Sequence, residues 1–264
     1  MKHYIAFIGA GKMAAALISC IYKSNISKSI IASDKDNKNL ANIKNQFKIK
    51  TTNDNKEAVR NSDIVFICVK PQDIDGVLDE IKNVINNQLI VSIAAGIKLK
   101  HLESKLKNKR IIRVMPNINC LAGEMAAGFS AGKYATKEDI KAVSEMLNSA
   151  GISLFLKENL MDAVTAVSGS GPAFFAYFID AFADAGVKNG LSRETALKLA
   201  AQTALGTGRL LMEKNLLPEE LISMVASKKG TTIAGLKILK SHKASDILIK
   251  TVNAAVKRSK ELGK

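Results

Sequence analysis

The chain has few of the residues on which metal-binding, disulfide-linked and base-stacking proteins depend. Its 264 residues include only three cysteines, three histidines and four prolines, and no tryptophan. The cysteines, Cys20, Cys68 and Cys120, are odd in number and lie far apart, so they predict neither a disulfide framework nor a cysteine-rich metal site. We interpret them as small buried apolar residues and expect no bound metal.

Long apolar runs are missing as well. No segment approaches the roughly 18 consecutive apolar residues that a membrane-spanning helix needs. The first residues pass straight into a strand-like run, without the apolar region and cleavage site of a signal peptide. We therefore expect a cytoplasmic protein with no membrane partner.

Acidic residues are outnumbered by basic ones, 24 to 39, which gives a formal net charge of +15. Such an excess is one mark of nucleic-acid-binding proteins. Here, however, the lysines are scattered over helices and loops, and aromatic residues, which stack on bases, make up only 5%. A solvated basic surface that favours anionic small molecules is the simpler interpretation, and we expect no nucleic-acid partner. A basic nucleic-acid binder is kept as an alternative.

What the first part of the chain does contain is a series of short apolar runs that alternate with helix-like segments. Continuous runs of this kind are typical of strands that are buried on both faces of a parallel sheet. The runs that we expect to form strands are residues 4–8, 29–33, 49–51, 63–69, 88–94, 110–115, 125–130 and 152–155.

From about residue 158 the strand-like runs stop, and long segments rich in alanine and leucine follow. Their apolar spacing predicts helices over residues 171–188, 192–214, 218–226 and 244–262. We therefore expect an α/β protein with a Rossmann-type, doubly wound sheet in a dinucleotide-binding domain, residues 1–157. An all-helical domain, residues 158–264, would follow, and its apolar helices favour dimerisation.

A glycine motif, Gly9-x-Gly11-x-x-Ala14, directly follows the first strand-like run and opens a helix-like segment. The first glycine permits a tight turn, the second lets a pyrophosphate approach the backbone, and Ala14 allows the helix to pack closely on the strand. The helix N-terminus favours the negative charge of that pyrophosphate. In this position the motif predicts a dinucleotide site.

Asp34 stands at the end of the second strand-like run. A carboxylate there accepts hydrogen bonds from the hydroxyls of the adenosine ribose and repels a 2′-phosphate. Lys35 and Lys38, close by, carry charge that would pair with such a phosphate. We therefore expect NADPH or NADH as the cofactor, with a slight preference for NADH.

Groups for acid, base or nucleophilic catalysis are scarce. The three histidines lie in unrelated segments that bear lysines, and Ser168-Gly169-Ser170-Gly171 lacks the pattern of a nucleophile elbow. A reductase with so few proton-transfer groups suits a substrate that is already activated for hydride attack.

Six segments, in order along nearly the whole chain, resemble the pyrroline-5-carboxylate reductase family. They are FIGAGKMA (7–14), VKPQ (69–72), SIAAGI (92–97), RVMPN (113–117), DAVTAVSGSGPAFFAYFIDAFADAGVKNGLSRETALKLAAQTALG (162–206) and GTTIAGL (230–236). All four prolines also fall where the family has proline. The resemblance implies the last step of proline synthesis, in which NAD(P)H reduces 1-pyrroline-5-carboxylate to L-proline.

The resemblance also implies roles for individual residues. Cofactor contacts are implied for the pyrophosphate at Ile8, Gly9, Ala10, Gly11, Lys12 and Met13, for the ribose at Asp34, for the adenosine half at Asn55, and for the nicotinamide at Cys68, Val69, Lys70, Pro71, Ile93, Ala94 and Ala95. Substrate contacts are implied at Ser227, Gly230, Thr231 and Thr232. Thr165 would be the catalytic residue that faces the ring nitrogen, although by itself it would be interpreted as a helix-interior threonine bonded to its own turn. The family's active site lies at a homodimer interface, and a higher homo-oligomer is compatible with it.

The chain departs from the family in the substrate loop. Where the family usually has Ser-Pro-Gly-Gly-Thr-Thr, this chain has Ser227-Lys228-Lys229-Gly230-Thr231-Thr232. The missing proline and glycine change the stiffness of the loop, and position 229 loses a residue that adopts positive φ at low cost. Leu217 and Ile118 also replace a common histidine and a common threonine.

Two other readings stay open beside this one. Another imine or β-hydroxyacid dehydrogenase would share the two-domain plan, but hydroxyacid enzymes would be expected to place a lysine base in residues 162–171, which contain none. A catalytically silent dinucleotide sensor belongs to a different class. Thr165 and the Gly-Thr-Thr sequence argue against it, because a silent protein has no use for them.

Overall fold

Strands and helices alternate along the first part of the chain in the computed structural model, which describes residues 3–27 and 29–263. Each of the expected strands forms, with ends within two residues of the expected ones. They are β1 (Ile5–Ile8), β2 (Ile30–Ser33), β3 (Lys50–Thr52), β4 (Ile64–Ile67), β5 (Leu89–Ser92), β6 (Arg110–Met115), β7 (Met125–Ala131) and β8 (Gly151–Phe155).

The strands form one sheet in the order β3-β2-β1-β4-β5-β6-β7-β8. Neighbouring strands are parallel except β6 and β7, which are antiparallel. The chain winds outward from β1 to β3 and then returns to β4 on the other side of β1. In open α/β sheets, ligands bind beyond the carboxyl ends of the strands at such a reversal. The predicted doubly wound α/β fold is thus confirmed, and it directs attention to the ends of β1 and β4.

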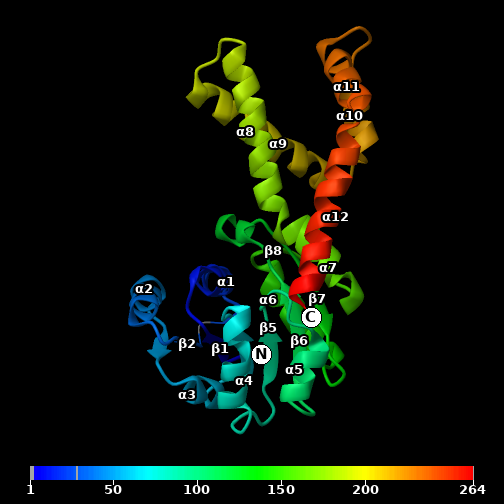
Figure 1. The fold of residues 1–264 in the computed structure, drawn as a ribbon. Helices are drawn as coiled ribbons and strands as arrows, with labels where there is room; N and C mark the ends of the chain where they lie inside the picture. The colour runs from blue at the N-terminus through cyan, green and yellow to red at the C-terminus, as the bar shows by residue number, and fades with distance from the viewer. Residues whose placement is uncertain (1–2, 28, 264) are drawn as a thin grey trace. The chain divides into compact units, whose positions relative to one another are not determined.

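Side chains of each central strand alternate between two apolar cores, one on each face of the sheet. In β1, Ile5 and Phe7 enter the first core, whereas Ala6 and Ile8 enter the second. This pattern explains why the strands read as continuous apolar runs. The first core is covered by α1 (Lys12–Lys23), α2 (Asn37–Phe47) and α6 (Lys137–Asn148), and the second by α3 (Asn55–Arg60), α4 (Ile74–Ile81) and α5 (Leu99–Lys105) (Figure 1).

Short helical segments connect these elements. They are η1 (Pro71–Asp73), η2 (Ile118–Ala122), η3 (Glu158–Leu160), α7 (Met161–Val164) and η4 (Thr165–Gly169). The last of these is a wide, π-helical turn, in which the Ser170 amide donates to the Thr165 carbonyl five residues back. Turns of this kind are rare and occur frequently at functional sites.

The chain forms two compact units, Met1–Ser170 with Ala255–Lys264, and Gly171–Ala254. These units differ from the predicted domains, residues 1–157 and 158–264, because α7 and the last turns of the chain belong to the first unit. The buried Ser259 hydroxyl, for example, donates to Asp162 Oδ1 at 2.7 Å.

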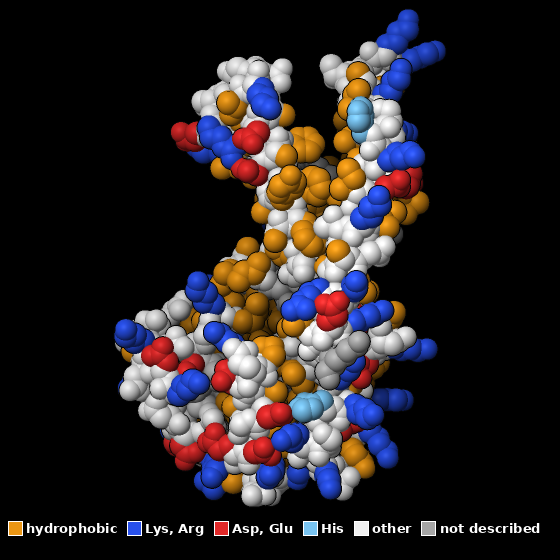
Figure 2. All heavy atoms as spheres, in the orientation of Figure 1, with side chains coloured by type: hydrophobic (Ala, Val, Ile, Leu, Met, Phe, Trp, Pro, Cys, Tyr) orange, Lys and Arg blue, Asp and Glu red, His pale blue; other side chains and the backbone are white. Residues whose placement is uncertain are grey.

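The second unit consists of helices that bury very little of their own apolar surface. Ala183 and Ala196 are buried where two of the helices pack together, but Phe175, Tyr177 and Phe182 are 66%, 73% and 69% exposed. Figure 2 shows many further hydrophobic side chains on the surface of these helices. The helices are α8 (Gly171–Lys188), α9 (Arg193–Glu213), α10 (Pro218–Val225), α11 (Thr231–Ser241) and the first part of α12 (Ala244–Leu262).

The described part of the chain offers neither a membrane-spanning helix nor a cluster of metal ligands. None of its helices combines the length and the apolar character needed to cross a membrane. Within residues 3–27 and 29–263, no three histidine, cysteine, aspartate or glutamate side chains gather as a metal site would require.

One charge lies inside the sheet of the first unit. Arg113 in β6 has a side chain only 5% exposed, and its Nη1 lies 3.0 Å from Glu158 Oε1. The same oxygen accepts a hydrogen bond from the Leu99 amide, 2.6 Å away, at the first residue of α5. Glu158 therefore balances the buried guanidinium and also fixes the start of a helix.

We expect Glu158→Ala to lower the free energy of unfolding by about 2 kcal/mol, because it leaves the buried guanidinium of Arg113 without a carboxylate partner. The double variant Arg113→Met with Glu158→Ala should recover more than half of that loss. Urea denaturation measures both, with Glu145→Ala, which removes an exposed pair, as the control. Equal losses in the single and double variants would contradict the pairing.

Candidate active site

The turn after β1 brings the backbone of Gly9 against the end of β4. Gly9 has a φ of +91°, and a Cβ atom placed on it would lie 2.9 Å from the carbonyl carbon and oxygen of Cys68. Its amide donates to the Ser33 carbonyl at 2.8 Å, so the turn is also tied to β2. Only glycine fits here, because both the backbone conformation and the space exclude a side chain.

The next glycine faces open space. Gly11 is the N-cap of α1 and has no side-chain cap, and a Cβ atom on it would meet no other atom within 4 Å. The amide groups at this helix start, and the positive end of the helix dipole, are therefore free to meet an anion. The arrangement fits the pyrophosphate of a dinucleotide, which needs close approach to the backbone.

Asp34, beyond the end of β2, is fixed by three hydrogen bonds. Its Oδ2 accepts from the Ala10 amide at 2.7 Å and from Asn39 Nδ2 at 3.2 Å, and its Oδ1 accepts from the Asp36 amide at 2.9 Å. The carboxylate is thus held beside the glycine turn. Lys35, which is 88% exposed, lies 3.7 Å from Asp73 Oδ1 and so has an acidic partner of its own.

A groove of about 560 Å³ joins these groups, at the place where the order of the strands reverses. Of the predicted cofactor residues, those that line it are Ile8, Gly9, Gly11, Asp34, Asn55, Cys68, Val69 and Lys70. Residues of α4 also line it, namely Gly76, Val77 and Glu80, and they are not among the residues predicted from the sequence. The only sequence signal for them was a glycine inside a helix-like run.

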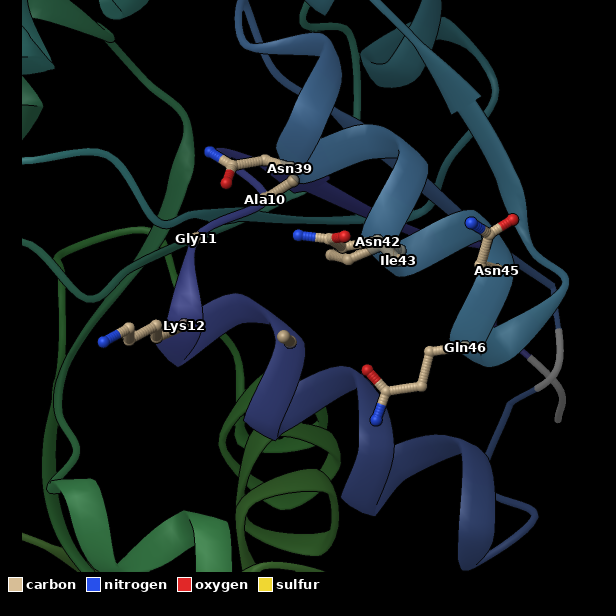
Figure 3. A pocket seen from close by; sticks show the side chains of 9 residues that line it. Ala10, Gly11, Lys12, Asn39, Asn42, Ile43, Asn45 and Gln46 are labelled. Atoms are coloured by element: carbon tan, nitrogen blue, oxygen red, sulfur yellow. The ribbon is translucent and has the colours of Figure 1, made fainter.

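The other predicted cofactor residues lie around this groove. Ala10 and Lys12 line an adjoining recess between α1 and α2, which also holds asparagine side chains of α2 (Figure 3). Met13 packs against the first core. Pro71 lines a separate recess at the start of α5, and Ile93, Ala94 and Ala95 follow β5 without lining the groove.

Cys68 lines the groove as a neutral thiol. Burial raises the pKa of this thiol well above its usual range, because desolvation disfavours the charged thiolate. A thiol of this kind is a poor nucleophile. Cys68 therefore contributes shape rather than covalent chemistry to the groove.

Thr165 begins the wide turn η4 and is half-buried. Its hydroxyl donates to the Met161 carbonyl at 2.8 Å, which is the helix-interior bond expected of an isolated threonine. The turn is anchored on β7, because buried Asn117 donates to the Ser168 carbonyl at 3.2 Å and accepts from the Ala126 amide at 3.2 Å. The Ser168 hydroxyl donates to the Ala126 carbonyl as well.

The predicted substrate loop belongs to the second unit. Gly230 is the N-cap of α11, and no side chain of the described residues caps that helix, so the amides of Thr231 and Thr232 are placed to receive an anion. Ser227 is exposed, and its carbonyl accepts from the Gly230 amide at 2.9 Å. Lys229 adopts a φ of +63°, so the loop keeps a left-handed conformation without a glycine.

These features define a class of protein. A glycine turn that opens a helix after the first strand, a fixed carboxylate after the second, and a groove at the strand reversal make up a nicotinamide-dinucleotide site of the Rossmann type. Such a site supports hydride transfer, and the chain is an NAD(P)-dependent oxidoreductase.

Comparison with known proteins agrees with this class and identifies a family within it. A family model described as pyrroline-5-carboxylate reductase dimerisation matches residues 158–262, and one described as NADP oxidoreductase coenzyme F420-dependent matches residues 4–96. Pyrroline-5-carboxylate reductases of Methanosarcina acetivorans and Arabidopsis thaliana are 44% and 39% identical, each over 98% of this chain and 98% and 95% of their own.

Solved structures give the same result. The pyrroline-5-carboxylate reductase of Coxiella burnetii is 31% identical, covers 100% of both chains and has a TM-score of 0.96. The Plasmodium falciparum pyrroline carboxylate reductase, solved with NADP bound, is 32% identical over 99% of this chain and 98% of its own, with a TM-score of 0.88. This chain belongs to the pyrroline-5-carboxylate reductase family.

We expect Lys229→Gly to raise the stability of the loop from Ser227 to Thr232, because glycine adopts positive φ without the strain of about 1 kcal/mol that another residue carries. Thermal unfolding of the full chain should shift upward by a few degrees. Lys228→Gly is the matched control, since its φ is not positive and glycine there should be neutral or slightly destabilising. A lower unfolding temperature for Lys229→Gly than for Lys228→Gly would contradict this account.

Proposed function

We propose that this chain reduces 1-pyrroline-5-carboxylate to L-proline with a hydride from NAD(P)H. The observation that carries the proposal is the 44% identity to a pyrroline-5-carboxylate reductase over 98% of both chains. The dinucleotide groove of the first unit supplies the physical counterpart, since it holds the groups that such a cofactor needs.

An absorbance assay at the nicotinamide band tests the proposal. Oxidation of NAD(P)H should depend on 1-pyrroline-5-carboxylate and yield proline. The competing hydroxyacid reading is tested in parallel with NAD⁺ and a β-hydroxy acid, where no reduction is expected. Turnover of the hydroxy acid without turnover of the imine would overturn the proposal.

The reaction requires little acid or base catalysis from the protein. When bound, NAD(P)H supplies a hydride from its nicotinamide C4. The cyclic imine protonates in water to an iminium, so the carbon of the C=N bond is already electrophilic, and orientation with electrostatics can provide most of the rate. The amides of Thr231 and Thr232 at the start of α11 would hold the substrate carboxylate, with Ser227 and Gly230 shaping the loop.

Thr165 is the group that we assign to the ring nitrogen. Its hydroxyl donates its proton to the Met161 carbonyl, so the hydroxyl oxygen can act toward the substrate only as a hydrogen-bond acceptor. An acceptor is what a protonated imine N–H requires, and it would favour the charged, reactive form of the substrate. Asn117 and Ser168 would serve this role by fixing the turn that Thr165 begins.

Thr165→Ala should therefore lower kcat about tenfold while leaving NADH affinity unchanged, because the variant loses one hydrogen bond to a charged group. Thr165→Ser keeps the hydroxyl and should stay near the wild-type rate. Steady-state kinetics and fluorescence titration with NADH separate the two effects, and circular dichroism checks the fold. An alanine variant as fast as the serine variant would remove Thr165 from the mechanism.

For cofactor choice, we propose that NADH serves at least as well as NADPH. The fixed carboxylate of Asp34 supports this, since it suits a free ribose diol and repels a 2′-phosphate. Lys35 supports the same preference, because its ammonium group is already paired with Asp73 and not with a 2′-phosphate. The NADP bound by the Plasmodium falciparum relative indicates that the family accommodates the phosphate as well.

Replacing Asp34 by serine should shift the ratio of kcat/KM for NADPH over NADH toward NADPH by at least about tenfold, because the like-charge repulsion is lost. Asp36→Ser is the matched control: it removes the same charge two residues away, and serine can still cap α2. A ratio that moves equally in both variants would show a general effect of charge and not a contact with the ribose.

We also propose that the active form is a homodimer, or a higher homo-oligomer, built through the second unit. Soluble monomers rarely expose apolar patches beyond a few hundred Å². Apart from Gly171, Ala183 and Ala196, the described residues of this unit are at least partly exposed, so a lone chain leaves it without a core. The match of residues 158–262 to a dimerisation model supports the same assembly.

Analytical ultracentrifugation should find no folded monomer at the concentrations used for assay. Dilution until the assembly dissociates should remove helical signal in circular dichroism together with activity, because the second unit then has no core of its own. A fully helical, active monomer would disprove obligate assembly.

A further inference from the structure

The last turn of α12 packs against the turn that joins β5 to α5. Gly96 in that turn has a φ of +79°, and a Cβ atom placed on it would lie 3.4 Å from the Leu262 carbonyl oxygen. A Cβ atom on Gly263 would lie only 2.8 Å from the Gly96 carbonyl oxygen. All three residues line the recess at the start of α5 that Pro71 also lines. Because the two glycines carry no side chain, the backbones of two segments that are far apart in the sequence come into contact here.

The same part of α12 also holds α7. The buried hydroxyl of Ser259 donates to Asp162 Oδ1 at 2.7 Å, and Asp162 lies one helical turn before Thr165. The Ser259 carbonyl accepts from the Gly263 amide at 3.1 Å. The bond to α7 and the contact with Gly96 therefore come from one hydrogen-bonded turn of helix.

The turn from β5 to α5 starts beside the dinucleotide groove. The Ile93 amide donates to the Ile67 carbonyl at 3.1 Å, which places the turn next to the end of β4, where Cys68 lines the groove. With the ribose at the end of β2 and the pyrophosphate at the start of α1, a bound dinucleotide would reach the ends of β4 and β5 with its nicotinamide.

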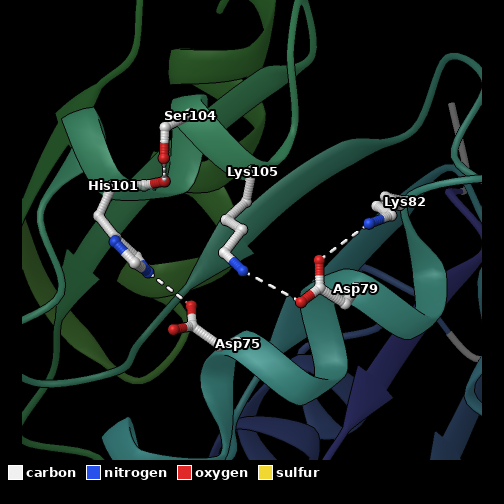
Figure 4. A network of polar contacts seen from close by, with 6 residues as sticks. All are labelled: Asp75, Asp79, Lys82, His101, Ser104 and Lys105. Carbon is white, nitrogen blue, oxygen red and sulfur yellow. Dashed lines mark hydrogen bonds and ion pairs between the residues drawn. The ribbon is translucent and has the colours of Figure 1, made fainter.

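Other elements hold both ends of this turn. It begins at β5, a central strand of the sheet, and ends at α5, which is fixed on α4 (Figure 4). His101 Nε2 of α5 lies 2.6 Å from Asp75 Oδ1 of α4. One turn further on, Lys105 Nζ lies 3.0 Å from Asp79 Oδ2. The two ends of the turn are thus anchored without α12.

The middle of the turn, in contrast, depends on α12. Its own hydrogen bond, from the Ile97 amide to the Ala94 carbonyl, is 3.4 Å long and therefore weak. Gly96 has no side chain with which to pack. Among the described residues, the contact with Leu262 and Gly263 is thus the main restraint on Gly96.

We propose that the last turn of α12 is a positioning element for hydride transfer. Gly263 holds the turn that we assign to the nicotinamide, and Ser259 holds the segment that carries Thr165. One turn of helix thereby fixes the hydride donor relative to the contact with the ring nitrogen, and neither residue touches the reacting atoms. A displacement of about 1 Å in such a geometry lowers the rate by up to about 100-fold. The inference rests on the proposed function, since it presupposes NAD(P)H and the imine at this site.

Gly263→Ala tests the contact with Gly96. The φ of Gly263 is not positive, so alanine adds a methyl group without backbone strain, and that methyl group meets the Gly96 carbonyl oxygen. We expect the rate of hydride transfer in a single turnover, measured by stopped flow at saturating NADH and imine, to fall at least about tenfold. Hydrogen exchange at residues 94–97 of the free protein should become faster. Affinity for ADP-ribose, which lacks the nicotinamide, should not change.

Glu261→Ala is the matched control. Glu261 lies in the same turn of α12, and its carboxylate forms an exposed pair with Arg258 Nη1 at 3.0 Å. Exposed pairs contribute little to stability, so all three readouts should keep their wild-type values. A loss of hydride transfer that is equal in the two variants, or that is accompanied by an equal loss of ADP-ribose affinity, would overturn the proposal, because general damage to the fold would explain it.

A double-mutant cycle tests the bond to α7. Ser259→Ala and Asp162→Ala should each slow hydride transfer severalfold at unchanged affinity for NADH, because each removes the same hydrogen bond. The double variant should be no slower than the slower single variant. Additive losses would show that the two residues act separately, and would overturn the role of Ser259.

The outcomes separate this inference from the proposed function. If the wild type transfers no hydride to 1-pyrroline-5-carboxylate, the proposed function fails, and the positioning role fails with it. If the wild type is active and Gly263→Ala matches it both in hydride transfer and in exchange at residues 94–97, only the positioning role fails.

Discussion

The backbone of Gly9 lies so close to the end of β4 that no side chain can come between them, and the rest of the first unit depends on this contact. Because β1 and β4 meet here without a side chain, α1 can start at once and present its free amides to the groove. The same turn is hydrogen-bonded to β2 through Ser33, and Asp34 reaches back to the Ala10 amide. A single steric constraint thus brings together the groups that we assign to the pyrophosphate and the ribose.

The second unit differs from the first, because its helices expose much apolar surface and little of its own chain covers that surface. Its helices are regular, but regular helices do not make a core. The loop from Ser227 to Thr232 depends on these helices, so the groups that we assign to the substrate carboxylate depend on the assembly that we propose. The first unit, with two full cores, does not share this dependence.

Much of this could be predicted from the sequence, because apolar runs and glycine positions are local signals. The strands, the helices 171–188 and 244–262, and the glycine turn all follow from patterns a few residues long. The wide turn at Thr165 could not be found, because it depends on Asn117 and Ser168 bonding to the backbone of β7. Glu80 was missed since its place in the groove depends on how α4 packs on the sheet. At Lys229 the left-handed conformation survives without glycine, which the residue type alone argues against.

The central claim is that hydride passes from the dinucleotide to the carbon of the C=N bond, and isotope transfer tests it most directly. The protein is incubated with 1-pyrroline-5-carboxylate and NADH deuterated at C4, on each face of the nicotinamide in turn, and the proline is analysed by mass spectrometry and NMR. We predict that one of the two cofactors, and not the other, places a deuterium on C5 of proline, and that solvent D₂O places none on that carbon. Proline without deuterium from either cofactor, or with C5 deuterium taken from D₂O, would contradict the account.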